Sequence, residues 1–109
     1  MSTTGFDRTD PAFQNLIDLF VSELDERIAS IENAVSDGDL LTLRRIGHQL
    51  KGSSGCYGFD EITQPAAALQ FACDNSESDA AIERAAARLV EVCRQVVAGR
   101  TPTPAGSAG

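Results

Sequence analysis

The single histidine of this chain, His48, is the side chain whose surroundings best suit a chemical role. Three of the nine basic residues, Arg44, Arg45 and Lys51, fall within eight positions around it. Nearby cations favour the neutral form of an imidazole and attract an anion that approaches its ring nitrogen. A neutral, exposed imidazole in such surroundings is a good nucleophile toward a phosphoryl group. The alternative is a surface histidine on a solvated helix face, where basic residues are ordinary.

The segment around His48 is predicted to be a helix from about Leu40 to about Cys56, which stops before Gly58. Apolar residues lie at about 160–220° from His48 on a helical wheel of about 100° per residue, and they are Leu43, Ile46, Leu50 and Tyr57. The core-facing side is therefore opposite the histidine. We expect the ring of His48 to project into solvent from the middle of the helix.

The predicted face around His48 also lacks bulk. Gly52 and Gly55 lie one and two turns after the histidine on the same side, and a third glycine, Gly47, stands in the same helix. A glycine inside a helix costs about 1 kcal/mol relative to alanine. We expect that the missing side chains at Gly52 and Gly55 leave room for another surface to reach the imidazole.

Helical periodicity extends through the rest of the chain, and no stretch alternates as a strand would. An apolar stripe that follows Asp10 and Pro11, an N-cap and a first-turn proline, predicts one long helix that ends at residues 36–39. A third helix is expected after Asp60, with Pro65 either delaying its regular part by a turn or kinking it. It fades at residues 74–76.

A fourth helix is expected to follow residues 76–79 and to stop at Gly99. Four amphipathic helices with short links predict an all-α fold, an antiparallel four-helix bundle. The chain of 109 residues has room for one domain, which we expect at residues 10–99. Residues 1–9 are expected to be a flexible N-terminus, and residues 100–109 a disordered tail of small residues and proline.

Composition excludes several classes of protein. Sixteen acidic residues against nine basic ones give a net charge of -7, which disfavours binding to nucleic acid or to an anionic membrane surface. The chain has no apolar run of about 20 residues and no secretory signal, so we expect a soluble, cytoplasmic protein. Its three cysteines, at positions 56, 73 and 93, lack the spacing of a metal site and are expected to act as small apolar side chains.

The stretch HQLKGSSGCYGF, residues 48–59, resembles the signature of histidine-containing phosphotransfer (HPt) domains. That signature reads His-x-Leu-Lys-Gly-small-small, with a glycine ten residues after the histidine. It is matched without a gap at His48, Leu50, Lys51, Gly52, Ser53, Ser54 and Gly58. The resemblance also covers the whole predicted domain, since HPt domains are four-helix bundles of about this length with the histidine on the second helix.

The resemblance implies a role for individual residues. His48 would be phosphorylated on Nε2, and Lys51 would steady the phosphoryl oxygens or meet the acidic site of the partner. Gly52 would supply clearance, and Gln70 matches a position where relatives place an amide or carboxylate that forms a hydrogen bond near the imidazole. The residues expected to dock the partner are Leu41, Arg44, Arg45, Gly52 and Gly55.

The resemblance also implies the partners. The phosphoryl group would be exchanged with an aspartate on the receiver domain of a response regulator, within a system that includes a sensor or hybrid histidine kinase. The chain has no phosphate-binding loop or acidic cluster for Mg²⁺ and a nucleotide, so we expect a carrier without a cofactor or a metal of its own rather than an enzyme. We expect a monomer, because the four apolar stripes are used internally, and the Met1 start favours a free-standing protein.

Other interpretations stay open. A helical adaptor or scaffold that binds a signalling partner through its surface would need the same fold but no chemistry. A relative that cannot be phosphorylated is another, against which the presence of His48 speaks. An enzyme with its own substrate pocket is disfavoured, because the chain has one histidine and no evident pair of acidic residues, and so offers few candidate catalytic groups.

Overall fold

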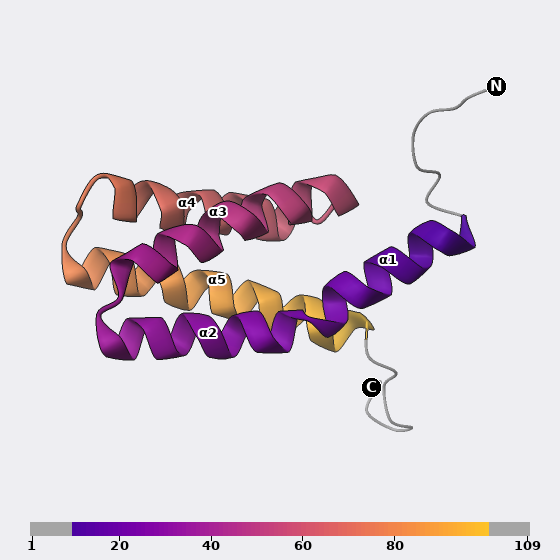
Figure 1. Ribbon diagram of the computed structural model, residues 1–109, viewed down its shortest axis with the longest axis horizontal. Helices are drawn as coiled ribbons and strands as arrows, with labels where there is room; N and C mark the ends of the chain where they lie inside the picture. Colours follow the sequence, from indigo (N-terminus) through magenta and orange to yellow (C-terminus); the bar gives the residue numbers. More distant parts are fainter. Residues whose placement is uncertain (1–9, 101–109) are drawn as a thin grey trace.

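The computed structural model describes residues 10–100, apart from the side chain of Arg100, and this part of the chain is helical. Its helices are α1 (Pro11–Ser22), α2 (Leu24–Asp37), α3 (Leu40–Tyr57), α4 (Asp60–Asp74) and α5 (Asp79–Arg100). Helices α2 to α5 form an antiparallel four-helix bundle, and α1 projects from one end of it (Figure 1). The predicted all-α fold is confirmed. The disordered tail expected at residues 100–109 is wrong at its first residue, because Arg100 is the last residue of α5. Residues 1–9 and 101–109, also expected to be flexible, lie outside the described residues.

The long first helix expected from the sequence is wrong in one respect, because the structure divides it at Glu23 into α1 and α2. The hydroxyl of Ser22 donates to the backbone oxygen of Leu19 (2.7 Å), and the backbone N–H of Glu23 donates to the same oxygen (3.1 Å). Serine hydroxyls that bond the preceding turn in this way often bend helices. The break directs α1 away from the axis of α2 (Figure 1).

The core of the bundle consists of the stripes that periodicity predicts. Helices α2 to α5 each place apolar residues three or four positions apart in the interior, among them Leu24, Ile31, Leu43, Leu50, Ile62, Leu69, Ile82, Leu89 and Cys93. Helix α1 closes one end of the bundle through aromatic contacts. The ring of Phe20 lies 5.4 Å from that of Tyr57 and 5.3 Å from that of Phe59, measured between centroids.

Local signals set the limits of α3, the helix that carries His48. The carboxylate of Asp39 accepts hydrogen bonds from the backbone N–H (3.1 Å) and the hydroxyl (2.6 Å) of Thr42, which caps the N-terminus of the helix. These bonds lower the pKa of Asp39 from its usual value of 3.8. At the other end, Gly58 adopts a left-handed conformation with φ of 84°, which non-glycine residues rarely adopt. The predicted bounds of this helix are confirmed.

Helix α4 begins at Asp60 and continues through Pro65, so the proline does not delay the helix by a turn. Pro65 is buried in the bundle, and the turns after it keep their helical register as far as Asp74. Gln70 therefore stands on the side of α4 that faces α3. Within the described residues, no helix is both long enough and apolar enough to span a membrane.

Candidate functional site

The side chain of His48 is exposed in the middle of α3, as the helical wheel predicts. Leu43 and Leu50, on the opposite side of the same helix, are each 1% exposed and anchor α3 in the core. On one flank, the side-chain oxygen of Gln49 accepts a hydrogen bond of 2.9 Å from Arg27 of α2. The histidine is thus presented outward by a helix that its neighbours hold in place.

The cations predicted around His48 differ in their surroundings. The Arg44 guanidinium forms an ion pair with Asp74, which ties α3 to the C-terminal turn of α4. Its charge is therefore already balanced by a carboxylate. Arg45 is exposed, while Lys51 is partly buried one turn after the histidine and has no carboxylate partner among the described residues. Arg45 and Lys51 are therefore the cations near His48 that form no ion pair among the described residues.

The glycines of α3 fall into two groups. A Cβ at Gly52 would meet nothing within 4 Å, and one at Gly55 would meet only the Thr63 hydroxyl, at 3.9 Å. Internal packing therefore does not demand either glycine, which agrees with a face kept clear for another molecule. Gly47 is different, because a Cβ there would lie 3.0 Å from the Ala66 oxygen and 3.1 Å from the backbone nitrogen of Gln70. The sequence analysis assigned no role to Gly47.

Gln70 is brought against the residue that precedes His48, since its backbone is the one that a Cβ at Gly47 would touch. Its Oε1 atom is buried and has no hydrogen-bond partner among the described residues. A buried acceptor without a donor costs about 1–3 kcal/mol. Among the described residues, Gln70 Oε1 is the one buried side-chain oxygen or nitrogen atom without a hydrogen-bond partner.

Three large apolar side chains stand exposed on α3 and α4, and Leu40, at the start of α3, is the least exposed of them. Leu41, two turns before His48 on the same side of α3, is 71% exposed, and Phe71, which follows Gln70 on α4, is 62% exposed. The sequence analysis named Leu41 and missed Phe71. The signal was present, because Phe71 lies roughly 200° from Leu69 on the wheel of α4, outside the apolar stripe of that helix. On the other flank, the exposed Leu16 and Leu19 of α1 border a small pocket with Ser53.

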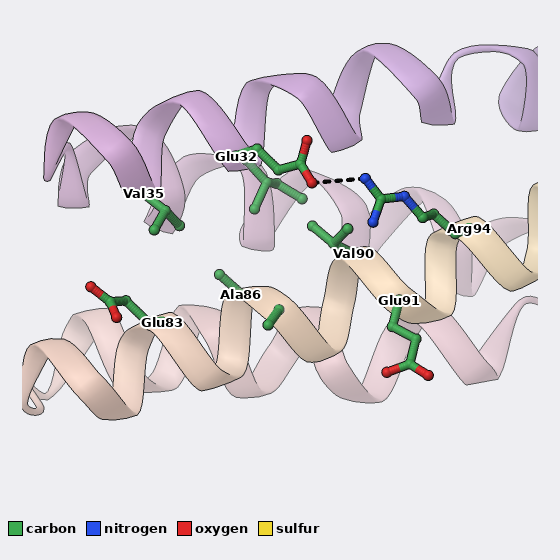
Figure 2. A pocket seen from close by; sticks show the side chains of 9 residues that line it. Glu32, Val35, Glu83, Ala86, Val90, Glu91 and Arg94 are labelled. Carbon is green, nitrogen blue, oxygen red and sulfur yellow. Dashed lines mark hydrogen bonds and ion pairs between the residues drawn. The ribbon is translucent and has the colours of Figure 1, made fainter.

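A larger hollow, of about 480 Å³, lies between α2 and α5 (Figure 2). Its floor includes Val35, Ala86 and Val90, and an ion pair of 2.8 Å between Glu32 and Arg94 crosses one end. None of its lining residues belongs to α3 or α4. This groove is therefore separate from the surface that presents His48.

The comparisons with known proteins bear on the whole domain. The family model described as Hpt domain matches residues 15–99 of this chain. The comparisons with curated proteins and with solved structures found no significant match. Hpt domains are helical carriers that take part in histidine phosphotransfer in two-component signalling, with response-regulator receivers and kinases as partners. The match runs from α1 almost to the end of α5, and the chain belongs to the Hpt domain family.

Proposed function

We propose that this domain carries a phosphoryl group on Nε2 of His48 and exchanges it with an aspartate of a receiver domain. The observation that carries the proposal is the exposure of His48 in mid-helix, opposite a buried apolar stripe that anchors α3 in the core. The Nε2 lone pair attacks phosphorus while the bond from phosphorus to the aspartyl oxygen breaks. The aspartate leaves as a carboxylate, and the reverse step unloads the carrier.

The neighbours of His48 have separate tasks in this proposal. Lys51 neutralises the negative charge on the phosphoryl oxygens during transfer, because it lies one turn from His48 and forms no ion pair within the described residues. Arg44 acts mainly by fixing α4 against α3 through Asp74. Arg45 and Leu41 contact the receiver, and Phe71 adds an aromatic contact on α4.

Gln70 is proposed to orient the imidazole. When a hydrogen bond holds the proton on Nδ1, the lone pair of the neutral ring is on Nε2, where the nucleophile is needed. The unpartnered Oε1 of Gln70 is an acceptor suited to Nδ1–H. Support comes from the contact between the Gln70 backbone and the position before His48.

The receiver supplies the rest of the machinery, including any metal ion, and a sensor or hybrid histidine kinase supplies the phosphoryl group at the start of the relay. The carrier itself needs no nucleotide or cofactor. We propose that it works as a cytoplasmic monomer and does not bind nucleic acid or membranes, in keeping with its net charge of -7.

The test is phosphate uptake from phosphorylated receivers of the source organism, measured as acid-labile label on the carrier. Wild-type protein is expected to accept the label from its cognate receiver. His48→Gln is expected to accept none while its circular dichroism spectrum stays unchanged, because the side chain is exposed. Label on the His48→Gln variant would contradict the assignment.

The adaptor interpretation separates from this proposal in the same experiment. The exposed Leu41 and Phe71 would serve a docking surface in either case. An adaptor binds its receiver but gains no phosphate, and its binding is unaffected by His48→Gln. Wild-type protein that binds a phosphorylated receiver tightly without taking up label would favour the adaptor.

A further inference from the structure

At Gly47 the backbone of α3 lies close to the backbone of α4. Gly47 is buried, and a Cβ built on it would lie 3.0 Å from the Ala66 oxygen, 3.1 Å from the Gln70 nitrogen and 3.5 Å from the Gln70 Cα. The first two distances are shorter than nine in ten real Cβ contacts. All three atoms belong to the backbone of α4, so no side-chain rotation would relieve the contact.

The cost of this glycine needs an explanation. Glycine in a helix interior is less favourable than alanine, and α3 carries this cost at Gly47 in addition to Gly52 and Gly55. What the chain gains at Gly47 is a close approach of two helix backbones. The approach lies at the position immediately before His48, and its partners on α4 are the backbones of Ala66 and Gln70.

We propose that Gly47 is a positioning residue, whose missing Cβ brings α4 close enough for Oε1 of Gln70 to reach the imidazole of His48. The inference rests on the proposed function, because it concerns the ring that is phosphorylated. Hydrogen bonds between N–H and oxygen are effective at about 2.7–3.2 Å, so a shift of a few tenths of an ångström matters. A methyl group at position 47 forces a shift of that size.

Two side-chain interactions link α3 and α4 on either side of Gly47. Toward the C-terminus of α3, the hydroxyls of Ser54 and Thr63 share a hydrogen bond of 2.7 Å. Toward its N-terminus, Arg44 is paired with Asp74. These links hold α3 and α4 together above and below the close approach. The substitution Gly47→Ala should therefore move the Gln70 backbone without separating the helices.

The experiment compares Gly47→Ala with Gly99→Ala in the full chain. Gly99 is a helical glycine near the end of α5 whose added Cβ would meet nothing within 4 Å. The first measurement is the tautomer of the unphosphorylated His48 ring, read from its ¹⁵N chemical shifts at a pH where the ring is neutral. We expect a predominance of Nδ1–H in the wild type and in Gly99→Ala, and a loss of that preference in Gly47→Ala.

The second measurement is the rate of phosphoryl transfer from a cognate phosphorylated receiver. Gly47→Ala should lower it by about tenfold, the factor that corresponds to one hydrogen bond. Because Gly47 acts through Gln70, the double variant Gly47→Ala/Gln70→Ala should be no slower than Gln70→Ala alone. An unchanged tautomer in Gly47→Ala, or losses that multiply in the double variant, would overturn the inference.

Two further outcomes keep the test decisive. If Gly47→Ala does not fold, Gln70→Ala with Gly47 in place must still abolish the Nδ1–H preference, and an unchanged tautomer there also overturns the inference. The tautomer is read without any receiver present. Phosphate uptake by His48→Gln would therefore refute the proposed function independently of the result at Gly47.

Discussion

Gly52→Gln should make the domain more stable and a poorer carrier at the same time. A Cβ at this position meets nothing within 4 Å, so the new side chain enters open space beside His48 without an internal clash. Glutamine is a better helix former than glycine by roughly 0.5–1 kcal/mol in a helix interior. For a domain of this size, that gain raises the midpoint of thermal unfolding by about 2–8 °C.

The same side chain should obstruct the approach of a receiver. It stands one turn from His48 on the face that Gly52 otherwise leaves bare. Displacing a docked surface by even a fraction of the length of a glutamine costs at least about 1.4 kcal/mol of transition-state stabilisation, which is tenfold in rate. We therefore expect the transfer rate at limiting receiver to fall by about tenfold or more.

The assay pairs a thermal melt followed by circular dichroism with single-turnover transfer from a phosphorylated receiver. Gly99→Gln is the matched control, because a Cβ at Gly99 also meets nothing within 4 Å but lies at the far end of α5. It should not slow transfer. A Gly52→Gln protein that transfers as fast as wild type would refute the clearance argument, and one that melts lower would refute the claim of open space.

Two more predictions concern the docking surface and the cap of α3. Phe71→Ala should weaken receiver binding by about tenfold, because exposed aromatic side chains are frequent binding anchors. The control is Leu40→Ala, at the start of α3, which should leave the dissociation constant unchanged. Equal dissociation constants for wild type and Phe71→Ala would contradict this role of Phe71. The pKa of Asp39 is lowered by its hydrogen bonds from Thr42, so the stability they provide is complete above pH 3.8 and is lost as the pH falls through the lower pKa of the folded state. Melting temperatures between pH 5 and pH 2 should therefore fall more steeply for wild type than for Asp39→Asn, because asparagine also caps a helix but does not titrate. Parallel curves for the two proteins would show that the Asp39 cap does not contribute to the loss of stability in acid.

Much of the bundle could be predicted from the sequence because helices are local structures. The spacing of Leu43 and Leu50 shows which side of α3 is buried, and the same spacing places His48 on the other side. Asp39 and Gly58 mark the ends of that helix through capping and a left-handed turn. The signature around His48 likewise depends only on order along the chain, so the family was recognisable before the structure was known.

The break between α1 and α2 was not predictable from the same pattern. The apolar stripe continues through Glu23 without an interruption, and neither proline nor glycine marks the bend. The direction of α1 depends on its contacts with distant residues, since Phe20 packs on Tyr57 and Phe59 more than thirty positions away. Periodicity carries no information on such contacts.

Apart from the break at Glu23, the chain alone thus determined which segments form helices, which side of each helix is buried and that His48 faces outward, because all three follow from a period of about 3.6 residues. Only the tertiary structure decided that Arg44 is neutralised by Asp74 and that the Gln70 backbone lies against Gly47. Those facts depend on the distance and rotation between α3 and α4, which the packing of the entire core sets. A wheel drawn for one helix contains neither quantity.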